Sequence, residues 1–180
     1  MKNDTEIVQI KKDLHVESSI DIVWNAWMNN NIVSQWFAPA AIIEPCIGGK
    51  YELYFIPGNL KQMNTRGCKI IDLVERQKLT FTWKAPDSFA EIINVEDNLT
   101  IIEITLEEME TNLTKINLLH SGFSNTEDWN KAFSWHDNAW TSVLSSLKSE
   151  LEKETVIFAA NHSRKRIEYK ETFKLLFCQV

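Results

Sequence analysis

Two histidines, His120 and His136, are the groups in this sequence best suited to chemistry. His120 ends an alternating strand pattern and His136 falls on the apolar stripe of a helical pattern, so both side chains are expected to face the interior. A histidine in that position can transfer a proton or anchor a polar group of a ligand. The same pattern fits two core histidines whose nitrogens are hydrogen-bonded within the protein. The residues alone leave both roles open.

The three cysteines do not form a recognisable reactive or metal-binding site. Cys46, Cys68 and Cys178 are odd in number and unpatterned, which argues against a disulfide framework. A metal ion held by the two histidines would need a third ligand, and neither these cysteines nor His15 have ligand-type spacing. The cysteines also lack the neighbours that activate a thiolate. We therefore predict no metal, no cofactor and no cysteine nucleophile.

The acidic residues and the glycine pair have simpler structural explanations. Gly48-Gly49 lacks the remainder of a phosphate-binding loop and fits a turn. Four glutamates fall on or near the outward face of one strand, which is typical of a solvated edge rather than of an acid/base pair. They are Glu103, Glu107, Glu108 and Glu110. We therefore assign no catalytic residue and expect binding rather than catalysis.

Aromatic residues outnumber what an ordinary core requires, with seven Trp and nine Phe. Large rigid rings either fill a core or line a cavity for flat, apolar ligands, and both uses are compatible with the pattern. The rings suited to a cavity are Tyr51, Phe55, Phe81, Trp83, Trp135 and Trp140. The predicted ligand pocket comprises Tyr51, Phe55, Phe81, Trp83, His120, His136 and Trp140.

The composition is that of a soluble globular protein of one domain, with 180 residues, 44% of them hydrophobic. A net charge of −6 gives no global basic field for nucleic acid. The N-terminal residues do not resemble a signal peptide, and no run of 18 apolar residues occurs that would span a membrane. We therefore expect a cytoplasmic location.

The last part of the chain, residues 155–180, differs from the rest and is predicted to be an extension of unknown structure beyond a domain of residues 1–154. Its basic run Arg164-Lys165-Arg166 is either a contact for an anionic partner or a membrane surface, or a solvated charge run. Its end is apolar and would be costly to expose, so it either packs on its own domain or forms a homodimer. These apolar residues are Phe173, Leu175, Leu176 and Phe177.

The candidate residues must be positioned by a sheet and by helices that flank it. Alternation predicts a first strand over 5–16, and helical spacing predicts two short helices after it, one carrying Ile20, Val23, Trp24 and Trp27 and one over 31–36. Ser18 or Ser19 is expected to cap the first helix. Residues 86–97 are expected to form a loop. Further strands are predicted over 50–56, 64–75 with Gly67 in its interior, 78–85, 99–110 and 113–121.

A long amphipathic helix is predicted to follow the strands. It begins near Asn125, Thr126 or Asp128, ends at about Glu154, and carries both His136 and Trp140 on its apolar stripe. A helix of that length needs a large apolar surface, which an antiparallel sheet of six or seven strands supplies. Such a sheet twists and can curl around the helix, and the gap between them is a natural pocket. The predicted class is therefore α+β.

Several short motifs, in this order and spacing, resemble one known family. They are Trp24, Trp36-Phe37-x-Pro39, Gly48-Gly49-Lys50-Tyr51, Gly67, Leu79-Thr80-Phe81-Thr82-Trp83, Leu113-Thr114-Lys115-Ile116, His120-Ser121-Gly122-Phe123 and Trp140-x-x-x-Leu144. The sequence over residues 5–152 thus resembles the START-like (SRPBCC) superfamily, in the subfamily named for homologues of the heat-shock-90 ATPase activator. It departs from the family in having Ala139 before the helix tryptophan, where glycine is usual, and in residues 155–180.

The resemblance implies a helix-grip fold, in which an antiparallel sheet holds a long C-terminal helix. Members of the superfamily include lipid and small-molecule carriers, polyketide cyclases and a co-chaperone domain, so function transfers less well than fold. We expect a binding module for a small hydrophobic or aromatic molecule. The alternatives are a cyclase or hydrolase that uses His120, His136 or Tyr51 as acid or base, and a chaperone or stress cofactor that acts through protein interaction.

Overall fold

The structure, a computed structural model, describes residues 8–95 and 99–161, with side chains as far as Lys153. Its helices are α1 (Ile20–Met28), α2 (Asn30–Trp36), α3 (Ala90–Ile93) and α4 (Glu127–Asn161), and a 3-10 turn, η1, spans Asp87–Phe89. Its strands are β1 (Val8–Val16), β2 (Ala40–Ile43), β3 (Tyr51–Ile56), β4 (Asn59–Asn64), β5 (Ile70–Val74), β6 (Lys78–Trp83), β7 (Thr100–Glu110) and β8 (Leu113–Phe123).

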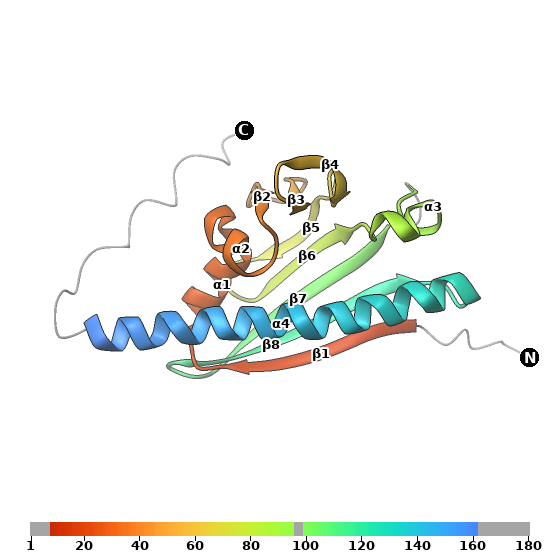
Figure 1. Ribbon diagram of the computed structural model, residues 1–180. Coiled ribbons are helices and arrows are strands. Elements are labelled where there is room, and N and C mark those ends of the chain that lie inside the picture. The colour runs from red at the N-terminus through yellow and green to blue at the C-terminus, as the bar shows by residue number, and fades with distance from the viewer. Residues whose placement is uncertain (1–7, 96–98, 162–180) are drawn as a thin grey trace, which may run out of the picture.

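The strands form two antiparallel sheets (Figure 1). Five strands in the order β1-β8-β7-β6-β5 make the larger sheet, and β2-β3-β4 make the smaller one. An isolated bridge between Lys50 and Lys69 joins the two. The predicted helix-grip class is confirmed, although the strands are divided between two sheets rather than gathered in one sheet of six or seven.

The long helix α4 runs along one face of the five-stranded sheet (Figure 1). Two polar contacts join it to the edge strand β1. The Lys12 Nζ atom lies 2.7 Å from Asp137 Oδ1, and the Lys148 ammonium donates to the His15 carbonyl at 2.7 Å. Both contacts sit at the rim, so they orient the helix on the sheet rather than supply the main stabilisation, which comes from the apolar surface beneath it.

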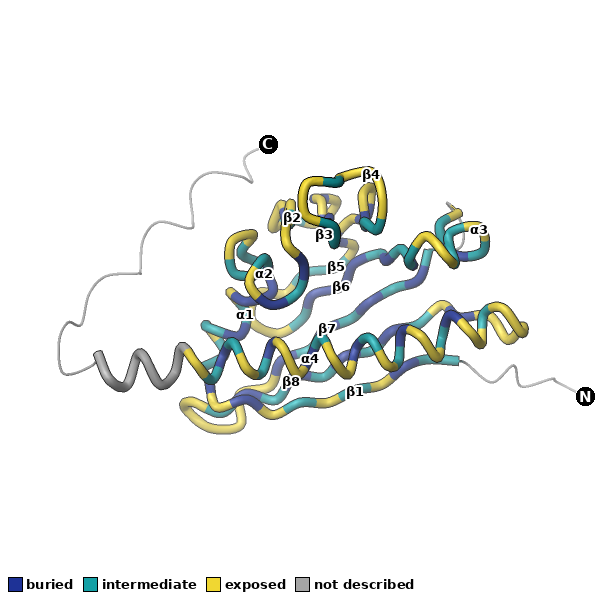
Figure 2. The backbone as a smooth tube through the Cα atoms, viewed as in Figure 1, coloured by how far each residue is buried: buried dark blue, intermediate teal, exposed yellow. Residues whose placement is uncertain are grey.

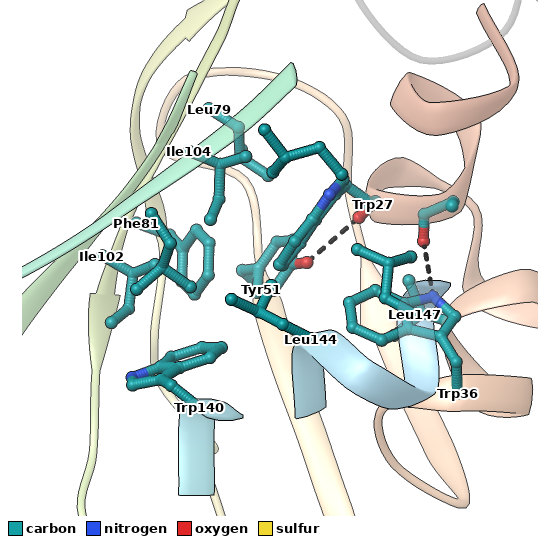
Figure 3. Packing of buried hydrophobic residues seen from close by; sticks show 14 of the residues in the cluster. Trp27, Trp36, Tyr51, Leu79, Phe81, Ile102, Ile104, Trp140, Leu144 and Leu147 are labelled. Atoms are coloured by element: carbon teal, nitrogen blue, oxygen red, sulfur yellow. Dashed lines mark hydrogen bonds between the residues drawn. The ribbon is translucent and has the colours of Figure 1, made fainter. Parts of the chain in front are cut away.

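The core lies between this sheet face, α4 and the pair α1–α2 (Figures 2 and 3). Alternate residues of β6 and β7 point into it and meet the apolar stripe of α4. Two polar groups of the core are satisfied by helix carbonyls: Trp36 Nε1 donates to Ala26 at 3.0 Å, and the Tyr51 hydroxyl donates to Trp27 at 3.0 Å. These bonds fix α1 against both α2 and β3, so the two short helices form a rigid end wall of the core.

The predicted strand over 64–75 is wrong in its first half. Strand β4 ends at Asn64, a turn follows, and β5 begins only at Ile70. The turn is closed by the Cys68 N–H, which donates to the Thr65 carbonyl at 3.0 Å, and Gly67 has a φ of 88°. That left-handed conformation suits glycine and is incompatible with a continuous strand. Gly67 is therefore a turn residue rather than a bulge.

The other boundaries agree more closely with expectation. Ser19 is the N-cap residue of α1, without a side-chain hydrogen bond, and the Thr126 carbonyl accepts the first bond of α4 from Asn130. The helix continues past the expected end at Glu154 to Asn161, and the loop over 86–97 contains η1 and α3. Residues 162–180, with the basic run and the apolar chain end, lie outside the described part, so the domain boundary at 154 stays a prediction. None of the helices described is both long and apolar enough to cross a membrane.

Candidate functional site

The seven residues predicted to line a pocket come together between the five-stranded sheet and α4. Six are buried and Phe55 is half-buried. β3 contributes Tyr51 and Phe55, β6 contributes Phe81 and Trp83, β8 contributes His120, and α4 contributes His136 and Trp140. We call this set the ring layer.

The members of the ring layer contact one another without interruption. Tyr51 stacks on Phe81 with ring centroids 3.9 Å apart, and Phe81 meets Trp83 edge-on at 6.1 Å. The remaining separations are 6.3 Å for Phe55–Trp83, 5.5 Å for Trp83–Trp140, 6.1 Å for Trp140–His120 and 4.9 Å for His120–His136. Offset and edge-on pairs of this kind are favourable beyond the area they bury. The ring layer is therefore a continuous set of contacting aromatic rings, with the two imidazoles at one end.

Tyr51 is occupied as a structural residue. Its ring is fully buried, and its hydroxyl donates to the Trp27 carbonyl (Figure 3). Burial raises the pKa of Tyr51 far above its usual range, so the phenol keeps its proton. The only proton of the Tyr51 hydroxyl is thus already given to a backbone carbonyl, which argues against Tyr51 as an acid or base.

His120 uses both of its ring nitrogens inside the protein. Trp140 Nε1 can only donate, and it does so to His120 Nδ1 at 3.0 Å. The proton of the neutral ring is therefore on Nε2, which donates to the Thr100 hydroxyl at 2.8 Å. Burial, and then the nearby His136, hold the pKa of His120 well below its usual range. His120 is thus a neutral, fully bonded connector between β8, β7 and α4.

His136 uses only one of its nitrogens. Its Nδ1 lies 2.7 Å from the Ala132 carbonyl one turn earlier in α4, a contact that requires a proton on Nδ1. Burial lowers the pKa of His136 to about 4, although the Ala132 carbonyl acts in the opposite direction. Its Nε2 is buried and has no hydrogen-bond partner among the described residues. Of the acid/base candidates, only His136 keeps a free position.

Several residues of this region were not selected from the sequence. Phe37, the C-cap residue of α2, stacks on Trp83 at 5.8 Å and meets Trp140 at 5.6 Å. Phe123 meets His120 at 4.5 Å and His136 at 5.7 Å. Both belong to motifs that carry the family resemblance, so their place in those motifs was the available signal. No signal in the sequence pointed to Thr100, because its partner His120 is twenty residues away and the contact depends on the register between β7 and β8.

Trp135 lies outside the ring layer, contrary to its choice as a cavity residue. It is 43% exposed and contacts Phe89 at 6.4 Å and His136 at 5.0 Å. A helix turns by about 100° per residue, so the neighbour of an inward-facing histidine points toward the helix flank. Trp135 therefore marks the outer margin of the site.

A cap segment, residues 86–94, covers the start of α4. Its own small apolar cluster contains Ile93 and Ala132, with Phe89, Ile92 and Trp129 packed around them. Asn94 closes the segment, because its side chain accepts from the Ala85 N–H at 2.7 Å and donates to the Ala85 carbonyl at 2.8 Å. The cap segment thus packs against the turn of α4 that holds His136 Nδ1.

Two hollows lie elsewhere on the described structure. One of about 10 Å³ lies between α1, α2 and α4 and is lined by Ile22, Ala26, Ile32, Trp36, Leu147, Glu150 and Leu151. The other, of about 280 Å³, lies over β1, β8 and β7 and is lined by Lys11, Lys12, Asp13, Glu103, Thr105, Asn117, Leu118 and Leu119. Most of its lining side chains point away from α4, since they alternate with core residues. Among the described residues, no group of three or more His, Cys, Asp or Glu is placed to hold a metal ion.

Comparisons with known proteins show the family of the chain through a family model and its fold through solved structures. The family model described as "Activator of Hsp90 ATPase homolog 1-like protein" matches residues 17–152. None of the curated proteins matches the chain. Among solved structures, a protein from Mesorhizobium loti is similar with a TM-score of 0.64 and 15% identity over 81% of this chain and 98% of its own.

Two other similar structures carry functional names. The Aha1 dimer from Colwellia psychrerythraea has a TM-score of 0.63 and 20% identity, over 81% of this chain and 97% of its own. An HSP90 activator from Plasmodium falciparum has a TM-score of 0.63 and 15% identity, over 80% of this chain and 96% of its own. At these identities the likeness establishes the shared fold.

Proposed function

Because the chain belongs to the family of Activator of Hsp90 ATPase homolog 1-like proteins, we propose that it binds a small hydrophobic or aromatic molecule between the five-stranded sheet and α4. The observation that carries this proposal is the ring layer. Its rings form one continuous aromatic surface in the interior, of the kind that suits a flat, apolar ligand.

The local polarity favours an apolar ligand. Both histidines of the ring layer are neutral, and the Tyr51 phenol keeps its proton. Among the described buried residues the only ionisable carboxyl is Glu52, which accepts from the Tyr54 hydroxyl and the Gly67 N–H and so lies in a separate cluster. A flat apolar molecule would meet ring faces here without having to bury a charge.

The ligand has a route into the ring layer at its less buried margins. Phe37 and Phe55 are only half-buried and contact each other at 6.2 Å, so small movements of these two rings would expose Trp83. The cap segment offers a second route, because it packs on α4 through a small apolar cluster separate from the main core. We therefore propose that binding separates rings that touch in the free protein.

The proposal is tested by native mass spectrometry of freshly purified protein, followed by thermal-shift screening with lipids and aromatic metabolites. We expect co-purified or added ligands to raise the unfolding temperature. Trp140→Phe should reduce that rise, whereas Trp135→Phe, a matched change at the exposed margin, should leave it intact. A protein that is always isolated empty, and that none of the compounds stabilises, would contradict the proposal.

A second candidate function is a cofactor of a heat-shock-90 chaperone. The family name and the Plasmodium activator favour it, as does the mixed-charge hollow of about 280 Å³ on the outward sheet face, which fits a protein surface better than a small molecule. The test is the ATPase rate of a purified chaperone with and without this protein. An activation abolished by Glu103→Lys, but not by Trp140→Phe, would assign the activity to that face. The dimer of the Colwellia protein makes a homodimer the first state to examine, by light scattering.

A further inference from the structure

We propose that the Nε2 atom of His136 is the polar anchor of the interior site, and that the ligand is an uncharged molecule that donates an O–H or N–H group to it. This inference rests on the proposed ligand-binding function and specifies the chemistry of the same ligand. It predicts that two apolar molecules of similar size bind differently when only one of them carries an O–H or N–H donor.

The first step is the identity of the free nitrogen as an acceptor. The contact of 2.7 Å between Nδ1 and the Ala132 carbonyl requires an N–H at Nδ1, because two acceptors would repel each other at that distance. The imidazole is neutral, since burial lowers its pKa to about 4. Nε2 therefore presents a bare lone pair, and any molecule that satisfies it must bring the proton.

The second step is the cost of leaving this atom unsatisfied. His136 is 1% exposed, and leaving a buried acceptor without a partner is costly. Three neighbouring rings contact it: Phe123 has no donor, His120 gives its only N–H to Thr100, and the indole N–H of Trp135 makes no hydrogen bond to Nε2. None of these neighbours supplies the missing bond in the described structure. A donor brought by a ligand would recover that free energy.

The third step concerns charge. Among the described residues no lysine or arginine is buried, so a carboxylate or phosphate ligand would find no counter-charge beside His136. An anion would also place a second acceptor against the Nε2 lone pair. A cationic ligand could donate a proton, but it would lose its hydration among apolar rings. The site therefore selects uncharged donors such as phenols and alcohols.

His120 provides an internal control within 5 Å of the proposed anchor. Its ring centroid lies 4.9 Å from that of His136, and it is buried to the same degree. Its nitrogens, however, are already bonded to Trp140 and Thr100. A ligand that merely enters the ring layer would perturb both rings, whereas a donor to Nε2 would specifically change the nitrogen resonance of His136.

The test uses three naphthalenes of nearly equal size: 2-naphthol, 2-methoxynaphthalene and 2-naphthoate. With the wild-type chain, we expect 2-naphthol to bind about tenfold more tightly than 2-methoxynaphthalene, the value for one buried hydrogen bond, and 2-naphthoate to bind most weakly. His136→Phe should remove the difference between the first two. His136→Gln, whose amide oxygen can accept, should retain part of it. Only 2-naphthol should shift the His136 Nε2 resonance more than the nitrogen resonances of His120.

The outcomes separate the two proposals. If 2-naphthol and 2-methoxynaphthalene bind equally well to the wild-type chain, the anchor is overturned and the ligand-binding function stands. If none of the three binds and the wider screen is also empty, the ligand-binding function itself fails. A crystal structure in which a water molecule occupies Nε2 both without and with 2-naphthol would also overturn the anchor. Thermal unfolding of each variant shows that the comparison is made on folded protein.

Discussion

The ring layer contains one buried histidine on a strand and one buried histidine on the long helix, and the two differ in their hydrogen bonds. On the strand side, His120 is tied to Trp140 and Thr100 by two hydrogen bonds. On the helix side, His136 is hydrogen-bonded to its own helix, and its Nε2 has no partner within residues 8–95 and 99–161. Burial and residue type therefore do not distinguish a connector from a candidate site; the count of satisfied nitrogens does.

We expect the largest loss of stability when the connector, His120, is replaced. His120→Phe keeps a ring of similar size but leaves Trp140 Nε1 without its acceptor and removes the donor to the Thr100 hydroxyl, which keeps only its bond of 3.4 Å to the Trp83 carbonyl. We expect the free energy of unfolding to fall by about 3 kcal/mol. Urea denaturation followed by tryptophan fluorescence measures the change. A loss below about 1 kcal/mol would show that the two sides are not energetically different.

The pH dependence of stability tests the neutral state of both rings. Their pKa values are lowered by burial, that of His136 to about 4, while an unfolded histidine titrates near 6.5. Below about pH 6.5 the two histidines bind protons in the unfolded chain but not in the folded chain, so the free energy of unfolding falls as the pH drops toward 4. For His136 alone the loss approaches about 3 kcal/mol. His136→Phe should flatten this part of the curve, and an unchanged slope would contradict the assignment.

A smaller effect is expected at the cap segment. Asn94→Ala removes the two hydrogen bonds to Ala85 and should destabilise residues 86–94 by about 1–2 kcal/mol, with little effect on the sheet. Hydrogen exchange should then quicken in the cap segment and in the first turns of α4, but not in β8. Equal acceleration around His120 would show that the cap segment covers both sides alike.

The smallest effect is expected for His136→Phe in the ligand-free protein at neutral pH. The substitution removes an unsatisfied acceptor, and the Ala132 carbonyl remains within the hydrogen-bonded turns of α4. We expect the stability to stay within about 1 kcal/mol of the wild type, on either side. Denaturation beside His120→Phe makes the comparison direct. Equal losses for the two variants would remove the distinction between connector and anchor.

The sequence was sufficient for the fold class, although it did not predict the division of the strands between two sheets. Alternation in β6 and β7 and the apolar stripe of α4 predict which side chains face inward, and the motifs predict how the elements combine. The use of the inward-facing rings as a ligand pocket stays a prediction. The strand predicted through Gly67 is wrong, because the left-handed φ of this residue places it in a turn.

The hydrogen-bond partners of the two histidines could not be predicted from the hydrophobic pattern or from the motifs. They depend on how far α4 is displaced along the sheet and on the pairing of β7 with β8, which periodicity does not record. Both histidines have the same apolar-face pattern, so the sequence treats them as equivalent. The cap segment was likewise read as a loop, because its short helical turns have no amphipathic period of their own.

The geometry of Trp83 and Trp140 has an optical consequence. Their indole rings lie 5.5 Å apart and are inclined by 44°, close enough for their electronic transitions to couple. Such a pair produces an exciton couplet in circular dichroism, whose amplitude falls steeply as the chromophores separate. Trp27 and Trp36, 4.8 Å apart, form a second such pair within the end wall. The part of the couplet that is lost in Trp140→Phe therefore reports the distance between sheet and helix, without an attached dye.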